Sequence, residues 1–289
     1  MGRRACLILI LALVLPTAAW GTDPSRAVRG ATGSRGSEPG GTASIEGEVA
    51  RPGVYPIREG ETLSSLTLAA GGFTDNAWLP GAVLLRPSEK ARQAEELSAI
   101  ARRLAAAIRS AGPGDAGSDA MRRFLDALST LAPSGRILIR LSHPRLLINA
   151  PEDLPIRDGD ILRIPAAPRT VRVLGAVRRP GEVEAPAGVR PAGLAASAGG
   201  FLPDADRDGA ILLSADGTAR LLSEGWVVWN EAAGRWELSR FRRNRPRIEP
   251  GDTVFIPRDP GRIPWPGGIE DYRKTMARIL EITGAGAAW

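Results

Sequence analysis

The chain has few side chains whose types and spacing could support catalysis or metal binding. His143 is the only histidine and Cys6 the only cysteine among 289 residues. Nucleophilic catalysis needs a base beside an activated nucleophile, and zinc sites need several Cys or His ligands. His143 precedes Pro144 and has no partner nucleophile, so we interpret it as structural or exposed. The sequence therefore predicts no enzyme, no metal site and no cofactor.

Two groups of aspartates could suggest carboxylate catalysis or calcium binding. Asp158 and Asp160 belong to a turn that occurs twice in the chain, and Asx-turn chemistry explains them. Asp204, Asp206 and Asp208 lack the later glutamate of an EF-hand loop. We interpret both groups as turns or solvated loops.

Arginine and tryptophan offer chemistry for binding rather than for catalysis. Guanidinium groups match carboxylates and phosphates, and indole rings can stack on sugar faces, so both suit an anionic polysaccharide. The simpler interpretation is that the arginines form the solvated face of amphipathic helices and that two of the tryptophans fill a small core. The candidate ligand-binding residues are Arg102, Arg103, Arg109, Arg122, Arg123, Trp226, Trp229 and Trp236.

The elements that carry these residues belong to a duplicated unit. Residues 47–73 open with G-E-V-A-R-P-G and close with A-G-G-F, and residues 175–201 open with G-A-V-R-R-P-G and close with A-G-G-F, without a gap between the two. Arg-Pro-Gly is a tight turn between two short strands, and the Gly-Gly pair ends an Ala/Leu-rich helical segment. The order strand, turn, strand, helix is the start of a ubiquitin-like β-grasp.

Both units also end alike, with a Gly-Asp turn and a strand that proline stops, at residues 157–165 and 249–257. The motifs V-x-R-P-G, A-G-G-F and G-D-x-[L/V]-x-I-P resemble the SLBB family, the soluble-ligand-binding β-grasp domains of polysaccharide export proteins. The likeness covers most of residues 45–260. It implies a binding module rather than an enzyme.

The first unit is longer than the second by about 36 residues between its Gly-Gly pair and its Gly-Asp turn. Apolar residues at helical spacing predict an αα-hairpin over residues 88–131, with Ser88 and Ser118 as N-caps. With this insertion the chain resembles the GfcC-like capsule biosynthesis proteins, which are periplasmic accessory proteins with a helical insertion in the first of two β-grasp domains and an amphipathic C-terminal helix. Full exporters carry an additional export domain, whereas only a linker precedes Ile45 here.

The two ends of the chain have different patterns. Arg3, Arg4 and the apolar run 7–15 predict a signal peptide over residues 1–21, followed by a Gly/Ser-rich linker over 22–43. The domains expected next are 44–168 and 169–260, and residues 261–289 form a tail.

The helix predicted in this tail, from 269 to 283, has a narrow apolar stripe and spans about 22 Å at 1.5 Å per residue, short of the roughly 30 Å hydrocarbon core. We therefore expect it to pack on the protein itself through Ile269, Tyr272, Met276, Ile279 and Leu280.

We predict an α+β chain with two tandem β-grasp (SLBB) domains, a helical hairpin in the first and an amphipathic C-terminal helix, exported to the periplasm. The resemblance implies a non-enzymatic accessory role in capsule or exopolysaccharide biosynthesis and export, with polysaccharide, an outer-membrane polysaccharide export protein or both as partners. Two alternatives stay open: a structural partner of the exporter that binds no glycan, and a DNA-binding SLBB protein of an uptake system. The net charge of +6, or +4 without Arg3 and Arg4, and the lack of a nucleic-acid motif disfavour the second alternative.

Overall fold

A computed structural model describes residues 40–111, 116–184, 191–222, 227–230, 235–238, 247–259 and 265–284, all within one compact unit. The predicted signal peptide, residues 1–21, and linker residues 22–39 lie outside the described residues.

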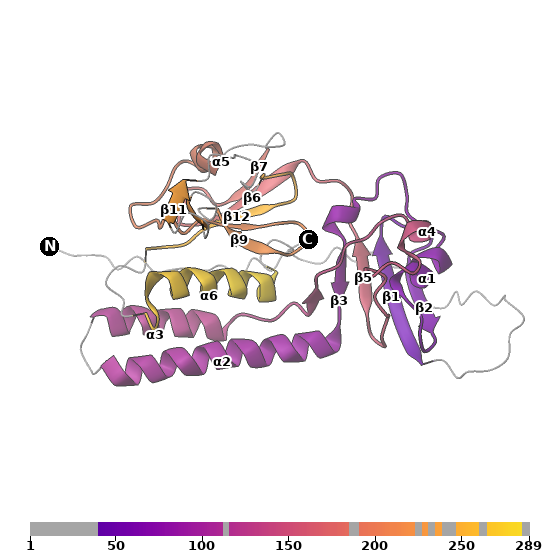
Figure 1. The fold of residues 1–289 in the computed structure, drawn as a ribbon, viewed down its shortest axis with the longest axis horizontal. Coiled ribbons are helices and arrows are strands. Elements are labelled where there is room, and N and C mark those ends of the chain that lie inside the picture. Colours follow the sequence, from indigo (N-terminus) through magenta and orange to yellow (C-terminus); the bar gives the residue numbers. More distant parts are fainter. Residues whose placement is uncertain are drawn as a thin grey trace, which may run out of the picture. The chain divides into compact units, whose positions relative to one another are not determined.

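Two β-grasp units follow one another along the chain, and a helix follows the second (Figure 1). The first contains β1 (Gly41–Gly47), β2 (Gly53–Ile57), α1 (Leu63–Ala69), the 3-10 helix η1 (Leu79–Gly81), β3 (Val83–Leu85), α2 (Pro87–Ala111), α3 (Ala116–Ser129), β4 (Arg136–Ile137), α4 (Pro144–Leu147) and β5 (Ile161–Ile164). The second contains β6 (Thr170–Gly175), β7 (Gly181–Glu184), α5 (Pro191–Ser197), β8 (Ile211–Leu213), β9 (Ala219–Leu221), β10 (Val227–Asn230), β11 (Arg235–Leu238) and β12 (Thr253–Ile256), and α6 (Gly268–Thr283) comes after it.

The two five-stranded sheets have the same topology. Their strand orders are β2-β1-β5-β3-β4 and β7-β6-β12-β8-β9. The central pairs β1–β5 and β6–β12 are parallel, and every other neighbouring pair in these two sheets is antiparallel. The registers also correspond, since Ile45 pairs with Gly53 in the first unit and Val173 with Gly181 in the second. The prediction of two tandem β-grasp domains in an α+β chain is confirmed.

The first strand of each unit ends in a glycine for the same steric reason. Gly47 has φ 85° and Gly175 has φ 89°, both in the left-handed region. A Cβ on Gly47 would collide with the carbonyl oxygen of Ile164, and a Cβ on Gly175 with that of Ile256. The repeated glycine therefore lets each first strand lie close to the closing strand of its unit.

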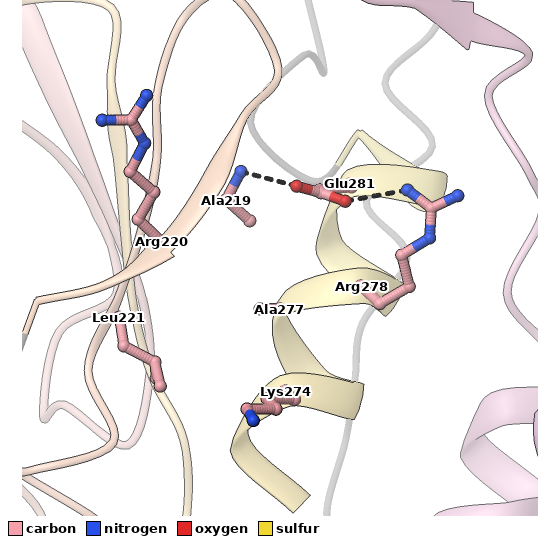
Figure 2. Close-up of a pocket in the computed structure, with 7 residues that line it drawn as sticks. All are labelled: Ala219, Arg220, Leu221, Lys274, Ala277, Arg278 and Glu281. Carbon is pink, nitrogen blue, oxygen red and sulfur yellow. Dashed lines mark hydrogen bonds and ion pairs between the residues drawn. The ribbon is translucent and has the colours of Figure 1, made fainter. Parts of the chain in front are cut away.

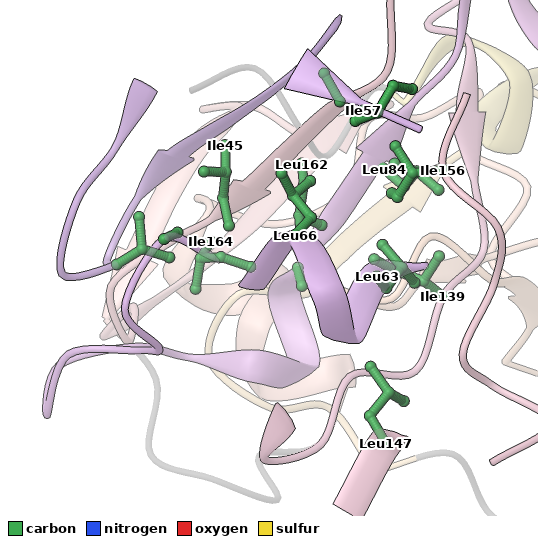
Figure 3. Close-up of a cluster of buried hydrophobic side chains, with 14 residues drawn as sticks. Ile45, Ile57, Leu63, Leu66, Leu84, Ile139, Leu147, Ile156, Leu162 and Ile164 are labelled. Carbon is green, nitrogen blue, oxygen red and sulfur yellow. The ribbon is translucent and has the colours of Figure 1, made fainter. Parts of the chain in front are cut away.

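A small apolar core lies between each sheet and its helix. In the first unit, Leu63 and Leu66 of α1 pack on Ile45, Leu162 and Ile164 of the central strands (Figure 3). In the second unit, the corresponding cluster includes Leu194 of α5, Val173, Val254 and Ile256. Full burial of such a side chain contributes roughly 1.5–3 kcal/mol, so these few residues hold each helix against its sheet.

The helical hairpin is inserted between β3 and β4. From Leu85 to Arg136 is 51 positions, whereas the equivalent step from Leu213 to Ala219 is six. The second unit is longer elsewhere, because the β10–β11 hairpin lies between β9 and β12. The first unit has additional residues at the helical hairpin and the second has additional residues at the β10–β11 hairpin. The predicted difference in length of about 36 residues is therefore the first addition minus the second.

The N-cap predictions for the hairpin were wrong. Helix α2 begins at Pro87 and α3 at Ala116, so Ser88 and Ser118 lie inside their helices. Proline suits the first helical position because its fixed φ is already helical and its missing N–H is not needed there. It therefore starts α2 one residue before the serine that we expected to cap it.

Helix α6 packs against the protein as predicted, but not through all the predicted residues. Tyr272, Ile279 and Leu280 are buried and Met276 contacts the same clusters, whereas Ile269 is 41% exposed. Trp265, which precedes the helix, is buried and stacks edge-on against Phe124 and Tyr272. Trp265 therefore makes the apolar contact at the start of α6 that the sequence predicted for Ile269. The helices that the structure describes include no apolar stretch of the length that a transmembrane helix needs.

Candidate functional site

Helix α6 lies between the helical hairpin of the first unit and the edge of the second sheet. On one side it contacts β8 and β9 of the second sheet, where Leu280 packs with Ile211 and Leu221. On the other side Tyr272 and Ile279 share a cluster with Leu97, Leu104, Met121 and Leu128 of α2 and α3. This seam brings together the insertion of the first unit, the edge of the second sheet and the C-terminal helix (Figure 1).

Ion pairs cross the seam beside these apolar contacts. Nε and Nη2 of Arg278 donate to the two carboxylate oxygens of Glu96 in α2, at 2.6 and 2.8 Å, and Nη1 donates to Glu281 at 2.8 Å. The other carboxylate oxygen of Glu281 accepts the backbone N–H of Ala219 in β9 at 3.0 Å. Hydrogen bonding to Arg278 lowers the pKa of Glu96, and the same bond raises the pKa of Arg278. The three side chains form a continuous polar connection from α2 to β9.

A pocket of about 250 Å³ lies beside this connection, between β9 and α6 (Figure 2). Its lining combines charged and apolar side chains: Ala219, Arg220, Leu221, Lys274, Ala277, Arg278 and Glu281. Arg278 and Glu281 are engaged with each other, whereas Arg220 and Lys274 form no ion pair with the described residues. Pockets for drug-sized ligands measure about 300–1,000 Å³, so this one suits a single small group.

The edge of the second sheet supplies backbone groups to the pocket. Strand β9 is the last strand of the sheet, and Leu222 N bonds to Ala210 O while Ser214 N bonds to Thr218 O. Because bonded and non-bonded pairs alternate in an antiparallel ladder, the backbone groups of Ala219 and Leu221 point outward. Glu281 takes the N–H of Ala219. The N–H and C=O of Leu221 have no hydrogen-bond partner within the part of the chain that the structure describes.

The two unpaired cations of the pocket have different positions. Lys274 extends from α6 toward β9 (Figure 2). Arg220 is the register partner of Leu212, which belongs to the core on the far face of the sheet, so its guanidinium points away from α6. An ammonium group, a backbone donor and acceptor and the apolar Leu221 are groups that can together hold a small ligand with a carboxylate.

The five candidate arginines of the hairpin fall into two sets. Arg102 and Arg122 form exposed ion pairs with Glu95 and Asp119, both at 2.7 Å. Arg103 pairs with Asp271 of α6 at 3.1 Å and donates to Thr275 Oγ1 at 3.0 Å, so its role includes holding the seam together. Arg109 in the last turn of α2 and Arg123 in α3 are exposed and form no ion pair with the described residues.

The tryptophan candidates are only partly covered by the structure. Trp229 in β10 and Trp236 in β11 are register partners in a two-stranded antiparallel sheet. Trp226 lies outside the described residues. The stacking hypothesis therefore stays a prediction.

Most of the acidic residues considered for catalysis or calcium have structural partners. Asp206 forms a two-pronged pair with Arg273 of α6, at 2.7 and 2.9 Å, and Asp204 pairs with Arg258. Asp158 accepts a hydrogen bond from the backbone of Thr42. Among the described residues, no group of three or more His, Cys, Asp or Glu side chains is arranged to hold a metal ion.

The repeated turn aspartates behave as turn chemistry predicts. Asp160 accepts the backbone N–H of Arg157 at 2.9 Å, and Asp252 accepts that of Glu249 at 2.8 Å. Asp160 is also paired with Arg86, whereas Asp252 is held by backbone N–H groups. Burial raises the pKa of Asp252 to about 6.

His143 has a structural role at the start of α4, whereas three charged residues of α6 line the pocket. His143 is exposed and its Nδ1 accepts from the backbone of Arg145 at the start of α4. Lys274, Arg278 and Glu281 line the pocket and are not among the residues that the sequence predicted for a site. Nothing local could have found them, because the partner Glu96 lies 182 positions away.

Comparison with known proteins agrees with the fold. The sequence profile of the SLBB domain matches residues 42–94 and 170–220, one match in each β-grasp unit. The chain contains two SLBB domains and is an SLBB domain protein. No curated protein matches the chain. SLBB domains are ligand-binding domains of proteins associated with polysaccharide export and are not known as enzymes.

Proposed function

We propose that this protein is a non-enzymatic periplasmic accessory protein in capsule or exopolysaccharide biosynthesis and export. The observation that carries the proposal is the match of SLBB domains to both β-grasp units. The order of elements adds support, since a helical insertion in the first unit and an amphipathic helix after the second are the features by which the sequence resembles the GfcC-like proteins.

We further propose that the bound ligand is an anionic glycan. It contacts cationic side chains that form no ion pair with the described residues, on the helical hairpin and beside the pocket. These are Arg109 and Arg123 on the hairpin and Lys274 on α6 beside β9. Exposed Arg and Lys side chains suit carboxylates spaced along a polymer. The paired residues Arg102, Arg103 and Arg122 are less available, because a ligand would have to displace their carboxylate partners.

Export to the periplasm is supported by the charged and apolar pattern of residues 1–21. Fractionation of the host cells, with N-terminal sequencing of the recovered protein, tests this step. Recovery in the periplasmic fraction with the first 19 to 21 residues removed is expected from the position of the small residues near Ala19. Recovery of the uncleaved chain in the cytosol would contradict it.

Binding is tested by titrating the protein with the purified surface polysaccharide of its host, at low and high salt. An acidic polymer should bind at low salt and weaken as salt rises, because exposed charges are screened within about 8–10 Å at physiological ionic strength. A neutral polymer of similar length serves as the control. Absence of binding to the host polymer, together with capture of an outer-membrane export protein, would favour a purely structural partner role.

A further inference from the structure

Residues 138–149, between β4 and the turn after α4, expose an unusual amount of apolar surface. Six large hydrophobic side chains of the described residues are exposed, and three of them lie in this segment. Leu146 is 74% exposed, Leu138 55% and Ile148 45%. Single apolar residues scattered over a surface are ordinary, so the occurrence of three within twelve residues of chain is the observation that needs an explanation.

The exposure is built into the fold, because the same segment is fixed to the core. Ile139 and Leu147 alternate with the exposed residues and are buried in the core of the first unit (Figure 3). Asn149, at the end of the segment, has φ 63° in the left-handed region, so the turn that follows α4 is tightly defined. The exposed side chains are therefore held outward by the buried ones.

The polar residues of this segment are basic. Arg140, His143 and Arg145 are exposed, and neither arginine forms an ion pair with the described residues. No acidic residue occurs between position 138 and Glu152. The exposed Ile269 has a different setting, because the acidic residues Glu270 and Asp271 follow it directly.

We propose that residues 138–149 rest on the surface of a bilayer that contains anionic phospholipids. Leu146 and Ile148 would enter the boundary between headgroups and acyl chains, while Arg140 and Arg145 lie against lipid phosphates. Apolar side chains flanked by cations without acids fit this surface, which is negatively charged outside and apolar beneath. The segment lies on the membrane and does not span it. This inference does not depend on the glycan site, which lies on other elements.

A single fluorescent probe tests the contact. A chain that begins at residue 22 keeps every described element and contains no cysteine, since Cys6 is the only one in the sequence. An environment-sensitive dye is attached to Leu146→Cys or, as the matched control, to Ile269→Cys. Vesicles of phosphatidylcholine mixed with phosphatidylglycerol should shift the emission of the dye at position 146 to shorter wavelength and leave the dye at position 269 unchanged.

Unlabelled variants separate the two contributions in a vesicle sedimentation assay. Arg140→Gln and Arg145→Gln should each reduce the partition coefficient about fivefold at low salt, and high salt should remove the difference. Leu146→Ser with Ile148→Ser should reduce it at least tenfold at any salt, whereas Ile269→Ser should not change it. Circular dichroism confirms that the variants are folded.

Two results would overturn the inference. One is equal emission at positions 146 and 269 with mixed vesicles. The other is wild-type protein that stays in the supernatant with both mixed and phosphatidylcholine vesicles. Binding of a purified export protein that is lost in the Leu146→Ser, Ile148→Ser variant, without vesicle binding, would assign the surface to a protein partner instead.

Discussion

Arg278 and Glu96, 182 positions apart in the chain, form a two-pronged ion pair that connects α6 to α2. The side chain of Arg278 is 38% exposed and that of Glu96 29%, so solvent screens the pair only in part. Arg278 also bonds Glu281, which in turn holds the edge strand β9. A helix inserted into the first β-grasp unit is thus connected to the sheet of the second through the C-terminal helix.

Breaking this pair should cost about 1 kcal/mol of unfolding free energy at neutral pH, because a partly exposed pair contributes no more than that. A double-mutant cycle with Glu96→Gln and Arg278→Gln, measured by chemical denaturation, gives the coupling directly. The pKa of Glu96 is lowered in the folded state, so the contribution is present above the ordinary carboxylate pKa and is lost as pH falls through the folded one. A coupling that stays constant down to pH 2 would show that the charge interaction is not its source.

Asp252 should give the opposite dependence on pH. Burial raises its pKa to about 6 from 3.8, so the folded state binds this proton more tightly than the unfolded chain does. Its carboxylate form destabilises the fold, and stability should fall as pH rises from about 4 to 6, by at most about 3 kcal/mol. Asp252→Asn should remove this slope, while the exposed Asp119→Asn should keep it. An unchanged slope in Asp252→Asn would contradict the assignment.

The repeated glycine of the first strand allows a steric test with a matched control. Gly47 and Gly60 have the same φ of 85°, but only at Gly47 would a Cβ collide with backbone, at the carbonyl of Ile164. Gly60→Ala should therefore cost about 1–2 kcal/mol from backbone strain alone. Gly47→Ala should cost roughly 1–3 kcal/mol more, from forced separation of β1 and β5. Equal losses of stability in the two variants would show that the strands can separate without cost.

The two sets of hairpin arginines should differ in binding to acidic polysaccharide. Arg109→Gln with Arg123→Gln removes unpaired charges and should weaken binding more than Arg102→Gln with Arg122→Gln, which removes the same charge from ion pairs. Arg103→Gln should act mainly on stability, because its partners are Asp271 and Thr275 of α6. Titrations at two salt concentrations compare the variants. Equal weakening by both double variants would mean that net charge alone governs binding.

The sequence predicted the elements that depend on local chemistry. Glycine and proline at fixed positions, such as Gly47 and Gly175, have backbone requirements that can be recognised without knowing what packs against them. The spacing of Tyr272, Ile279 and Leu280 similarly revealed the buried face of α6. The duplication supported the prediction of two β-grasp units, because each motif occurs once in each unit.

The candidate site could not be predicted in the same way. The pair between Glu96 and Arg278 joins distant segments, and a charged residue on a helix gives no sign of whether it meets solvent or another helix. Ile269 followed the helical period but lies beyond the surface that buries the helix, where Trp265 takes its place. Periodicity describes a face of a helix, whereas the extent of contact is set by the neighbouring elements.

The proposal that this SLBB domain protein serves export of a surface polysaccharide is tested most directly in its host. The amount of polysaccharide at the cell surface is measured with the gene intact, with the gene removed, and with the gene restored on a plasmid. Removal should lower the surface polysaccharide and restoration should return it, without loss of the enzymes that build the polymer. Equal amounts at the cell surface with and without the gene would contradict the proposed function.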